Sequence, residues 1–192
     1  DVKVGDPGPG EIRIRHQASG LNFIDVYYRT GLYKAPGLPF IAGNEASGEV
    51  LAVGPGVTNF HPGDRVAYYF NLGGYATERN IPWEKLVKLP DHITYEQGAV
   101  LMLKGLTVWY LLHKTFKVEP GHRVLIHAAA GGIGLLACGR RFARGERGAL
   151  ASGDGHAAAI KAVAGKAERT EDFLAALDLL AFVLGEIAGD LR

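Results

Sequence analysis

The 192-residue sequence predicts an α/β protein of two domains, a compact barrel-type β domain in residues 1–90 and a helix-rich domain in residues 91–192. Short β-rich segments separated by glycine and proline turns dominate the first domain. After Pro90, apolar residues recur at helical spacing instead. A short apolar run then leads through a glycine-rich turn into a helix at Val124 to Gly134, a pattern typical of nucleotide-binding domains.

The strands of the first domain are predicted in chain order from alternation and turn chemistry. Isoleucine and arginine alternate in EIRIR at residues 11–15, which is typical of a strand buried on one face. Further strands are expected over Gly48 to Val53, before a Gly-Pro-Gly turn, and over Arg65 to Tyr69, after a Pro-Gly-Asp turn. The segments GGYATERNIP and KLVKLP add two short strands. The polar run Gly43 to Glu45 is expected as a tight turn between the end of one strand and the start of the next.

Helical spacing begins at Tyr95 and continues to Phe116. Gly98 and Gly105 are expected to divide this segment into two helices, because glycine weakens a helix interior. Later in the chain the pattern is weaker and rich in alanine and glycine. Two further helices are expected there, over residues 157–164 and 172–187.

Composition excludes several classes of partner. Lys and Arg number 21 against 20 Asp and Glu, so the net charge of +1 gives no expectation of a nucleic-acid partner. No window reaches the roughly 18 apolar residues of a membrane span, so no membrane partner is expected. A single cysteine, Cys138, excludes an internal disulfide and a four-cysteine zinc site, and it favours a cytoplasmic setting.

The glycine-rich turn is the strongest chemical signal. Arg123 to His127 is predicted as a short buried strand and Gly134 to Ala143 as a helix. Between them the dinucleotide fingerprint G-x-G-x-x-G is matched by Ala129, Gly131 and Gly134, with alanine in the first position. The start of the helix then offers N–H groups and partial positive charge to a pyrophosphate. The structural alternative is a tight strand-to-helix turn that uses small residues only for packing.

The residue that distinguishes NAD from NADP is expected about 20 positions beyond this turn, in ASGDGHAAAIK. Asp154 would accept a hydrogen bond from a ribose 2′-hydroxyl and favour NAD. Ser152, His156 and Lys161 would instead hold a 2′-phosphate and favour NADP. These residues alone leave both alternatives open.

Five segments in a fixed order carry a family resemblance: GLNFIDVYYRTGLY, GNEASGEVLAVGPGV, PGDRVAY, LKGLTVWYLL and HAAAGGIGLLAC. Together they resemble the medium-chain dehydrogenase/reductase superfamily, and within it the zinc-independent, ζ-crystallin-like quinone oxidoreductases. The resemblance extends from about Pro9 to Cys138. It implies a GroES-like N-terminal domain, a Rossmann nucleotide-binding domain, NADPH as cofactor, a small-molecule quinone as substrate and a homodimer.

The resemblance also implies that no metal is bound. Zinc-dependent alcohol dehydrogenases of the superfamily carry Cys where this chain has Asn22, and His-Glu where it has Asn44 and Glu45. Amides replace thiolate and imidazole poorly at a tetrahedral zinc site. An alcohol needs a Lewis acid before it releases hydride, whereas a quinone is already an electron-poor acceptor. The stretch around Asn44 is therefore interpreted as a vacated metal site that persists as polar lining.

Site residues follow from the positions that match the family. Asn22, Asp25, Tyr27 and Tyr33 are expected to line the catalytic site beside the nicotinamide, although plain core packing is the alternative for both tyrosines. Lys104 is expected to face the cofactor, against the alternative of a surface lysine whose stem covers apolar neighbours. The cofactor-binding set is Asn22, Lys104, Thr107, Ala129, Gly131, Gly132, Ile133, Gly134, Ser152, His156 and Lys161.

The resemblance ends after Cys138. Gly148 and Ala149 stand where β-branched residues would fill the next strand, and the remaining residues suffice for about half of the usual six-stranded sheet. We therefore expect a partial Rossmann domain, and an internal deletion and a frame change are both open as its cause. Two alternatives to quinone reduction remain: an enoyl or other activated-alkene reductase of the same superfamily, and a truncated, non-catalytic paralogue.

Overall fold

The computed structural model describes residues 3–119, 124–128 and 130–143. The chain forms two compact units, one ending at Leu103 and the next beginning at Lys104. The predicted domain boundary after residue 90 lies before this division and stays a prediction. The helices expected over residues 157–164 and 172–187 lie outside the described residues.

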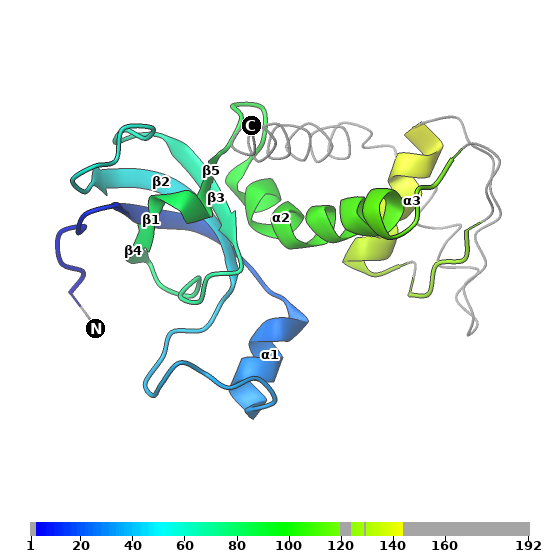
Figure 1. Cartoon of the computed structure of the whole chain (residues 1–192), viewed down its shortest axis with the longest axis horizontal. Coiled ribbons are helices and arrows are strands. Elements are labelled where there is room, and N and C mark those ends of the chain that lie inside the picture. Colours follow the sequence, from blue (N-terminus) through cyan, green and yellow to red (C-terminus); the bar gives the residue numbers. More distant parts are fainter. Residues whose placement is uncertain (1–2, 120–123, 129, 144–192) are drawn as a thin grey trace. The chain divides into compact units, whose positions relative to one another are not determined.

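The first unit is built on a five-stranded antiparallel sheet (Figure 1). Its strands lie in the order β4-β1-β2-β3-β5, and all neighbouring strands pair antiparallel. The strands predicted from alternation and turn chemistry are confirmed. Their bounds are β1 Glu11–Gly20, β2 Glu45–Val53, β3 Arg65–Tyr69, β4 Glu78–Pro82 and β5 Leu86–Lys88.

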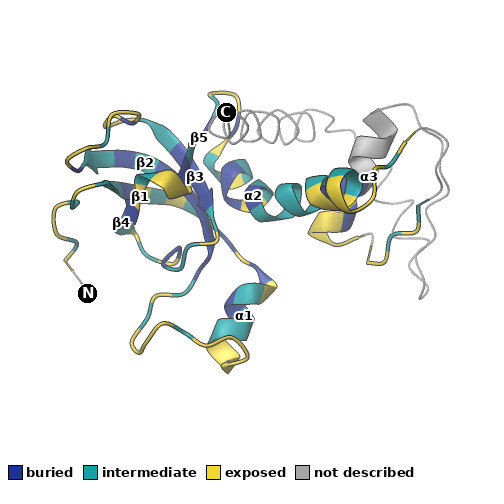
Figure 2. Cartoon of the chain, in the orientation of Figure 1, coloured by how far each residue is buried: buried dark blue, intermediate teal, exposed yellow. Residues whose placement is uncertain are grey.

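The core of this unit lies on one face of the sheet, as the alternation predicts. Ile12 and Ile14 of β1 are fully buried, whereas Arg15 between the strand's inward positions is exposed. Val66 of β3 and Ile81 of β4 belong to the same apolar cluster. Figure 2 shows the buried positions concentrated along the strands. Each such side chain contributes roughly 1.5–3 kcal/mol by leaving water.

The segment before β2 differs from the prediction. Residues 40–44 form no strand, and the expected strand before the polar turn is wrong. Their backbone instead accepts hydrogen bonds from a second loop: the N–H groups of Gly73 and Gly74 donate to the Gly43 carbonyl, and that of Tyr75 donates to Ala42. Gly43 has φ of 92°, and a Cβ there would lie 2.7 Å from the Tyr75 backbone nitrogen. Hydrogen bonds between two loops, residues 42–43 and 73–75, therefore take the place of the expected strand pairing before β2.

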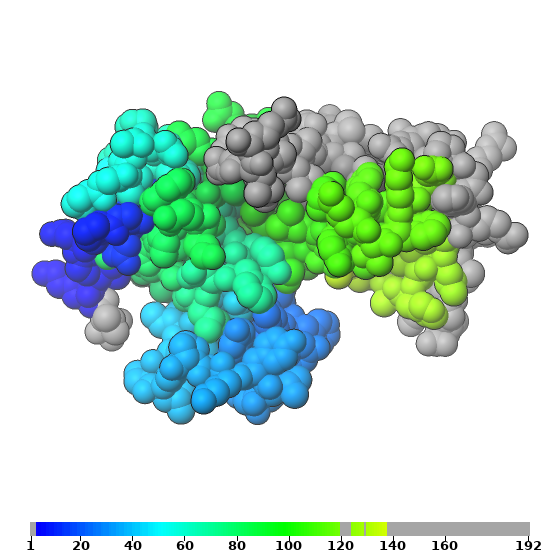
Figure 3. Space-filling model, viewed as in Figure 1, coloured from blue at the N-terminus to red at the C-terminus, as the bar shows by residue number. Residues whose placement is uncertain are grey.

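Helix α1, Phe23–Thr30, projects from the end of β1 with the loop that follows it (Figures 1 and 3). The Asp25 carboxylate accepts a hydrogen bond from the Asn22 N–H, which satisfies one of the free donors at the start of the helix. Gly31 ends the helix in the left-handed conformation, with φ of 77°. A hydrogen bond between the Asn22 backbone and the Asp25 side chain thus holds the start of α1.

Helix α2, Tyr95–Trp109, is continuous and passes into a π-helical segment, Tyr110–Thr115. The prediction that Gly98 and Gly105 divide it is wrong. A Cβ at Gly98 would lie 2.9 Å from Leu89 Cδ1 and 3.3 Å from Ser47 Cβ, so glycine here permits close packing. That packing offsets the roughly 1 kcal/mol that glycine costs in a helix.

The second unit contains the end of α2, the glycine-rich turn and helix α3, Gly132–Ala143. The predicted helix is confirmed and begins two residues earlier than expected. The predicted strand is wrong for its described residues, since Val124 to His127 has no strand conformation and Leu125 is 58% exposed. A parallel strand exists only when paired, and no strand is present among the described residues of this unit to pair with it. None of the described helices is both long and apolar enough to cross a bilayer.

Candidate functional site

A cluster of buried polar side chains lies where β1, α1 and β2 meet in the first unit. Asn22, Asp25, Asn44 and Glu45 are 8%, 5%, 2% and 0% exposed. Buried polar groups are costly unless each has a hydrogen-bonding partner, and charged ones more so. The local fold brings them together, because Asn22 and Asp25 open α1 while Asn44 and Glu45 open β2.

The Asp25 carboxylate is the first of two acceptor centres in this cluster. Its Oδ1 accepts from Asn44 Nδ2 at 2.8 Å. Its Oδ2 accepts from the Asn22 N–H at 3.0 Å and from the Tyr75 hydroxyl at 2.9 Å. Three donors from three different segments therefore satisfy one buried carboxylate.

The Glu45 carboxylate is the second acceptor centre. Its Oε2 accepts from Asn22 Nδ2 at 2.7 Å, and its Oε1 accepts from the Leu103 N–H of α2 at 2.9 Å. The buried residues around Asn44 thus alternate amides with carboxylates, while their role as the lining of a vacated metal site stays a prediction. Both asparagines turn their NH2 groups toward a carboxylate, because a carboxylate oxygen can only accept.

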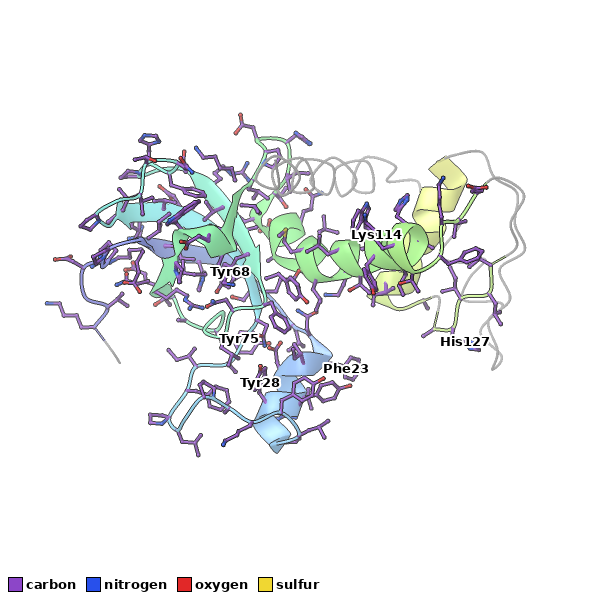
Figure 4. The ribbon with its side chains drawn as sticks, in the orientation of Figure 1. Phe23, Tyr28, Tyr68, Tyr75, Lys114 and His127 are labelled. Atoms are coloured by element: carbon purple, nitrogen blue, oxygen red, sulfur yellow. The ribbon has the colours of Figure 1, made fainter. Side chains whose placement is uncertain are left out.

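Tyr75 is a member of the cluster that the sequence did not reveal. Tyr75 follows two glycines in the loop after β3, where Figure 4 labels it. Its side chain is 43% exposed, although its hydroxyl donates a hydrogen bond to buried Asp25. Burial, the hydrogen bond to Asp25 and the charge of that carboxylate raise the pKa of Tyr75 to about 12. The hydroxyl therefore remains a donor at physiological pH. A lone tyrosine in a glycine-rich loop carries no signal that separates this role from packing.

The predicted tyrosines form an aromatic group on α1 and the loop that follows it. The ring centroids of Tyr27 and Tyr33 are 5.4 Å apart in an edge-to-face arrangement, and the Tyr33 N–H donates to the Tyr27 carbonyl. Tyr28 adds a second edge contact to Tyr33 and a contact to Phe40. Tyr33 is 46% exposed and Tyr27 half-buried, so neither is a plain core residue. The structure therefore places Asn22 and Asp25 at the N-terminal end of α1, and it gathers the tyrosines along the second half of the helix and just beyond its C-terminal end.

Two predicted cofactor residues lie on α2 in the second unit. Lys104 and Thr107 are half-buried and one helical turn apart, so they share a face of the helix. A Cβ built on Gly132 would lie 2.7 Å from Lys104 Cδ and 3.0 Å from its Cε. The absence of a side chain at Gly132 thus leaves room for the lysine stem at the first residue of α3.

The turn before α3 is compact. The Gly131 N–H donates to the Ala128 carbonyl at 2.8 Å, and Ala128 has φ of 51°, a conformation that alanine adopts only under strain. Gly131, Gly132 and Ile133 are exposed at the start of α3, whereas Gly134 is buried within it. A helix N-terminus with an adjacent lysine is suited to a phosphate group. Of the remaining predicted cofactor residues, Ala129, Ser152, His156 and Lys161 lie outside the described residues.

The described residues contain no group of three or more His, Cys, Asp or Glu side chains that could hold a metal ion. The arrangement can position ligands by amide and hydroxyl donors and by carboxylate acceptors. It can also present aromatic surface beside them.

Comparison with known proteins gives consistent matches. The alcohol dehydrogenase GroES-like domain family matches residues 8–91. The quinone oxidoreductase of Pseudomonas aeruginosa is 56% identical over 139 residues, which cover 72% of this chain and 43% of that protein. Quinone oxidoreductase 1 of Escherichia coli is 50% identical over 134 residues, which cover 69% of this chain and 41% of that protein.

A solved structure extends the match. The Escherichia coli quinone oxidoreductase complexed with NADPH superposes with a TM-score of 0.75 and 40% sequence identity, covering 93% of this chain and 50% of that one. The chain thus spans less than half the length of the curated relatives it matches. The similarity supports a GroES-like domain followed by a partial Rossmann domain.

Proposed function

Because the chain belongs to the medium-chain dehydrogenase/reductase superfamily, in its zinc-independent, ζ-crystallin-like quinone oxidoreductase branch, we propose that it catalyses the NADPH-dependent reduction of quinones. The observation that supports this most directly is the buried cluster of amides and carboxylates at Asn22, Asp25, Asn44 and Glu45. By the family resemblance, three of these residues, Asn22, Asn44 and Glu45, match positions at which zinc-dependent members carry Cys, His and Glu. A site of donors and acceptors suits an acceptor that needs no Lewis acid.

The cofactor side of the proposal rests on the second unit. Lys104, Thr107 and the start of α3 from Gly131 to Gly134 would hold the phosphates, and Ser152, His156 and Lys161 would hold the 2′-phosphate. NADPH, when bound, supplies a hydride. The fit is supported by Gly132, whose missing side chain leaves space for the Lys104 stem beside a helix N-terminus.

The acceptor side of the proposal rests on the first unit. Tyr27 and Tyr33 would contact a planar quinone through their aromatic faces, since both are accessible and already arranged edge-to-face. Asn22 would orient the reacting groups, while Asp25 holds the start of α1 through the Asn22 N–H. This environment would shield the site from water and hold donors near the developing oxyanion.

Assembly and location complete the proposal. We expect a homodimer, as the resemblance implies, and a cytoplasmic setting, which the single cysteine favours. Analytical ultracentrifugation of the purified chain would measure its oligomeric state. A monomer at micromolar concentration would contradict it.

Steady-state turnover tests the function. NADPH oxidation is followed by absorbance at 340 nm with 1,4-naphthoquinone or with a 2-enoyl thioester as acceptor, on the full chain. We expect turnover of the quinone and little of the thioester. A preference for the thioester would make the chain an activated-alkene reductase instead, and folded protein with neither activity would support a non-catalytic paralogue. Lys104→Met should lower kcat/KM for NADPH, whereas Lys3→Met, at an exposed position near the N-terminus, should not.

A further inference from the structure

Glu45 joins two parts of the chain that the proposed function uses separately. Its side chain is fully buried, and its two oxygens accept hydrogen bonds from two different segments of the chain. Oε2 holds the Asn22 side-chain amide at 2.7 Å. Oε1 holds the backbone N–H of Leu103 in α2 at 2.9 Å. A fully buried carboxylate is costly to place in a protein, and these two hydrogen bonds help to offset its desolvation penalty.

The contact with α2 belongs to a wider docking surface along β2. Ser47 lies two residues beyond Glu45, on the same face of the strand. Its hydroxyl donates to the Tyr95 carbonyl at the start of α2. A Cβ at Gly20, the partner of Glu45 across the β1–β2 ladder, would lie 2.1 Å from the Ala99 carbonyl oxygen and 2.8 Å from Glu45 Oε2. The backbones of β1 and α2 are therefore in close contact around this carboxylate.

Glu45 also determines which end of the Asn22 amide points away from it. An ionised carboxylate oxygen accepts hydrogen bonds and cannot donate them. The NH2 end of the Asn22 side chain must therefore face Glu45. A flipped amide would place Asn22 Oδ1 against Glu45 Oε2, at about the 2.7 Å that now separates Nδ2 from Oε2. Asn22 is the residue expected beside the nicotinamide, and Leu103 directly precedes Lys104, which is expected at the cofactor phosphates.

We propose that Glu45 is a positioning residue for the reaction: one carboxylate sets the amide orientation of Asn22 and the place of the α2 backbone immediately before Lys104. The proposal rests on the proposed function for its catalytic meaning, whereas the two hydrogen bonds can be tested without it. The glutamate of the Gly-Asn-Glu turn then links the side chain at the start of α1 to the α2 backbone at Leu103, within the first unit. Misplacement of reacting groups by about 1 Å can cost about 100-fold in rate, so such a link has a measurable effect.

The test compares Glu45→Gln with Glu49→Gln, which removes a half-buried carboxylate from the same strand. NMR of the full chain, isotopically labelled, records the Asn22 side-chain amide and the Leu103 backbone amide. In Glu45→Gln we expect both resonances to move upfield and the Leu103 amide to exchange faster with solvent. In Glu49→Gln we expect neither change. Unaltered resonances and exchange in a folded Glu45→Gln chain would overturn the proposal.

Kinetics then separate positioning from stability. With naphthoquinone as acceptor, kcat/KM of Glu45→Gln should fall about 10- to 100-fold at a temperature where circular dichroism shows a fully folded chain. A residue that only stabilises the fold would leave kcat and KM of the folded protein unchanged, and that result would overturn the positioning role. If the wild-type chain has no turnover, the proposed function fails, while the NMR comparison still tests the two bonds.

A second variant covers the case in which Glu45→Gln does not fold. Asn22→Ala leaves Glu45 in place and removes only one of its partners. Because one carboxyl group bonds both residues, the Leu103 amide resonance should move in this variant, and it should stay in place in Asn59→Ala, at an exposed turn. A Leu103 resonance that is the same in Asn22→Ala and wild type would contradict the link.

Discussion

Replacing Asn44 with aspartate is expected to destabilise the first unit by about 3 kcal/mol at neutral pH. In the native chain, Asn44 Nδ2 donates to Asp25 Oδ1 at 2.8 Å, and both residues are buried. Asn44→Asp keeps the shape of the side chain and removes the donor. It places a carboxylate oxygen against a carboxylate oxygen at hydrogen-bonding distance.

The magnitude follows from two effects. A hydrogen bond to a charged group contributes about 1.5–3 kcal/mol, and this one is lost. Leaving two like charges in a buried site costs more still, so the pair avoids it by retaining a proton. The pKa of one carboxyl group then rises in the folded protein above the value of about 3.9 that aspartate has in the unfolded chain.

The sign of the pH dependence follows from this retained proton. Above pH 4 the unfolded variant has lost a proton that the folded variant still binds. The free energy of unfolding of Asn44→Asp, relative to wild type, therefore falls as pH rises, by up to about 1.4 kcal/mol per pH unit, until the raised native pKa is passed. The stability deficit is expected to be smallest near pH 4 and largest at pH 8.

Urea denaturation followed by tryptophan fluorescence and circular dichroism measures this deficit. Asn59→Asp is the matched control, because it adds the same charge in an exposed turn. It should change the free energy of unfolding by less than about 0.5 kcal/mol at either pH. An Asn44→Asp chain as stable as wild type at pH 8, or an equal loss in Asn59→Asp, would refute the hydrogen-bonding role of Asn44.

Three further predictions concern neighbouring contacts. Tyr75→Phe should abolish the phenol that titrates near pH 12 in ultraviolet absorbance. Because that pKa is raised in the folded state, wild-type stability should fall between pH 10 and 12. The pKa values of Tyr68 and Tyr69 are raised as well, so the variant should show a smaller fall, and a fall as large as in wild type would contradict the assignment. Gly20→Ala should lower the free energy of unfolding in urea by about 3 kcal/mol, because the added Cβ would lie 2.1 Å from the Ala99 carbonyl oxygen. Gly37→Ala is the control: a Cβ there would have no atom within 4 Å, so this variant should be as stable as wild type or more stable. Burial lowers the pKa of His16, so the free energy of unfolding of wild type should decrease as pH falls below 6.5. In His16→Gln this decrease should be smaller. The same pH dependence of stability in the variant as in wild type would assign the decrease to other groups.

The sequence predicted the sheet well because its strands follow simple rules. Alternation in residues 11–15 and turn chemistry before Arg65 depend on local residues, and the structure confirms both strands. The division of α2 at Gly98 failed for the opposite reason. Glycine at position 98 makes room for the side chains of Leu89 and Ser47, which lie outside this helix. Helix propensity alone could not distinguish a glycine that ends a helix from one that permits such a tertiary contact.

The site shows the same distinction. Asn22 and Asp25 could be found from a family motif, and the structure brings both into one hydrogen-bonded cluster with Asn44. Tyr75 could not, because its role depends on a loop that folds back over residues 42–43. The role of Glu45 depends on the docking of α2, a tertiary contact between residues 58 positions apart. Local spacing carries no information about such contacts.

Nucleotide binding tests the central claim most directly. Titration of the full chain with NADPH, followed by nicotinamide fluorescence, should give a saturable increase for wild type. Gly132→Ala should weaken it, because the added Cβ would displace the Lys104 stem from the start of α3, while Gly37→Ala should leave it unchanged. No binding by a wild-type chain that circular dichroism shows to be folded, or equal binding by Gly132→Ala, would contradict the assignment of this turn to NADPH.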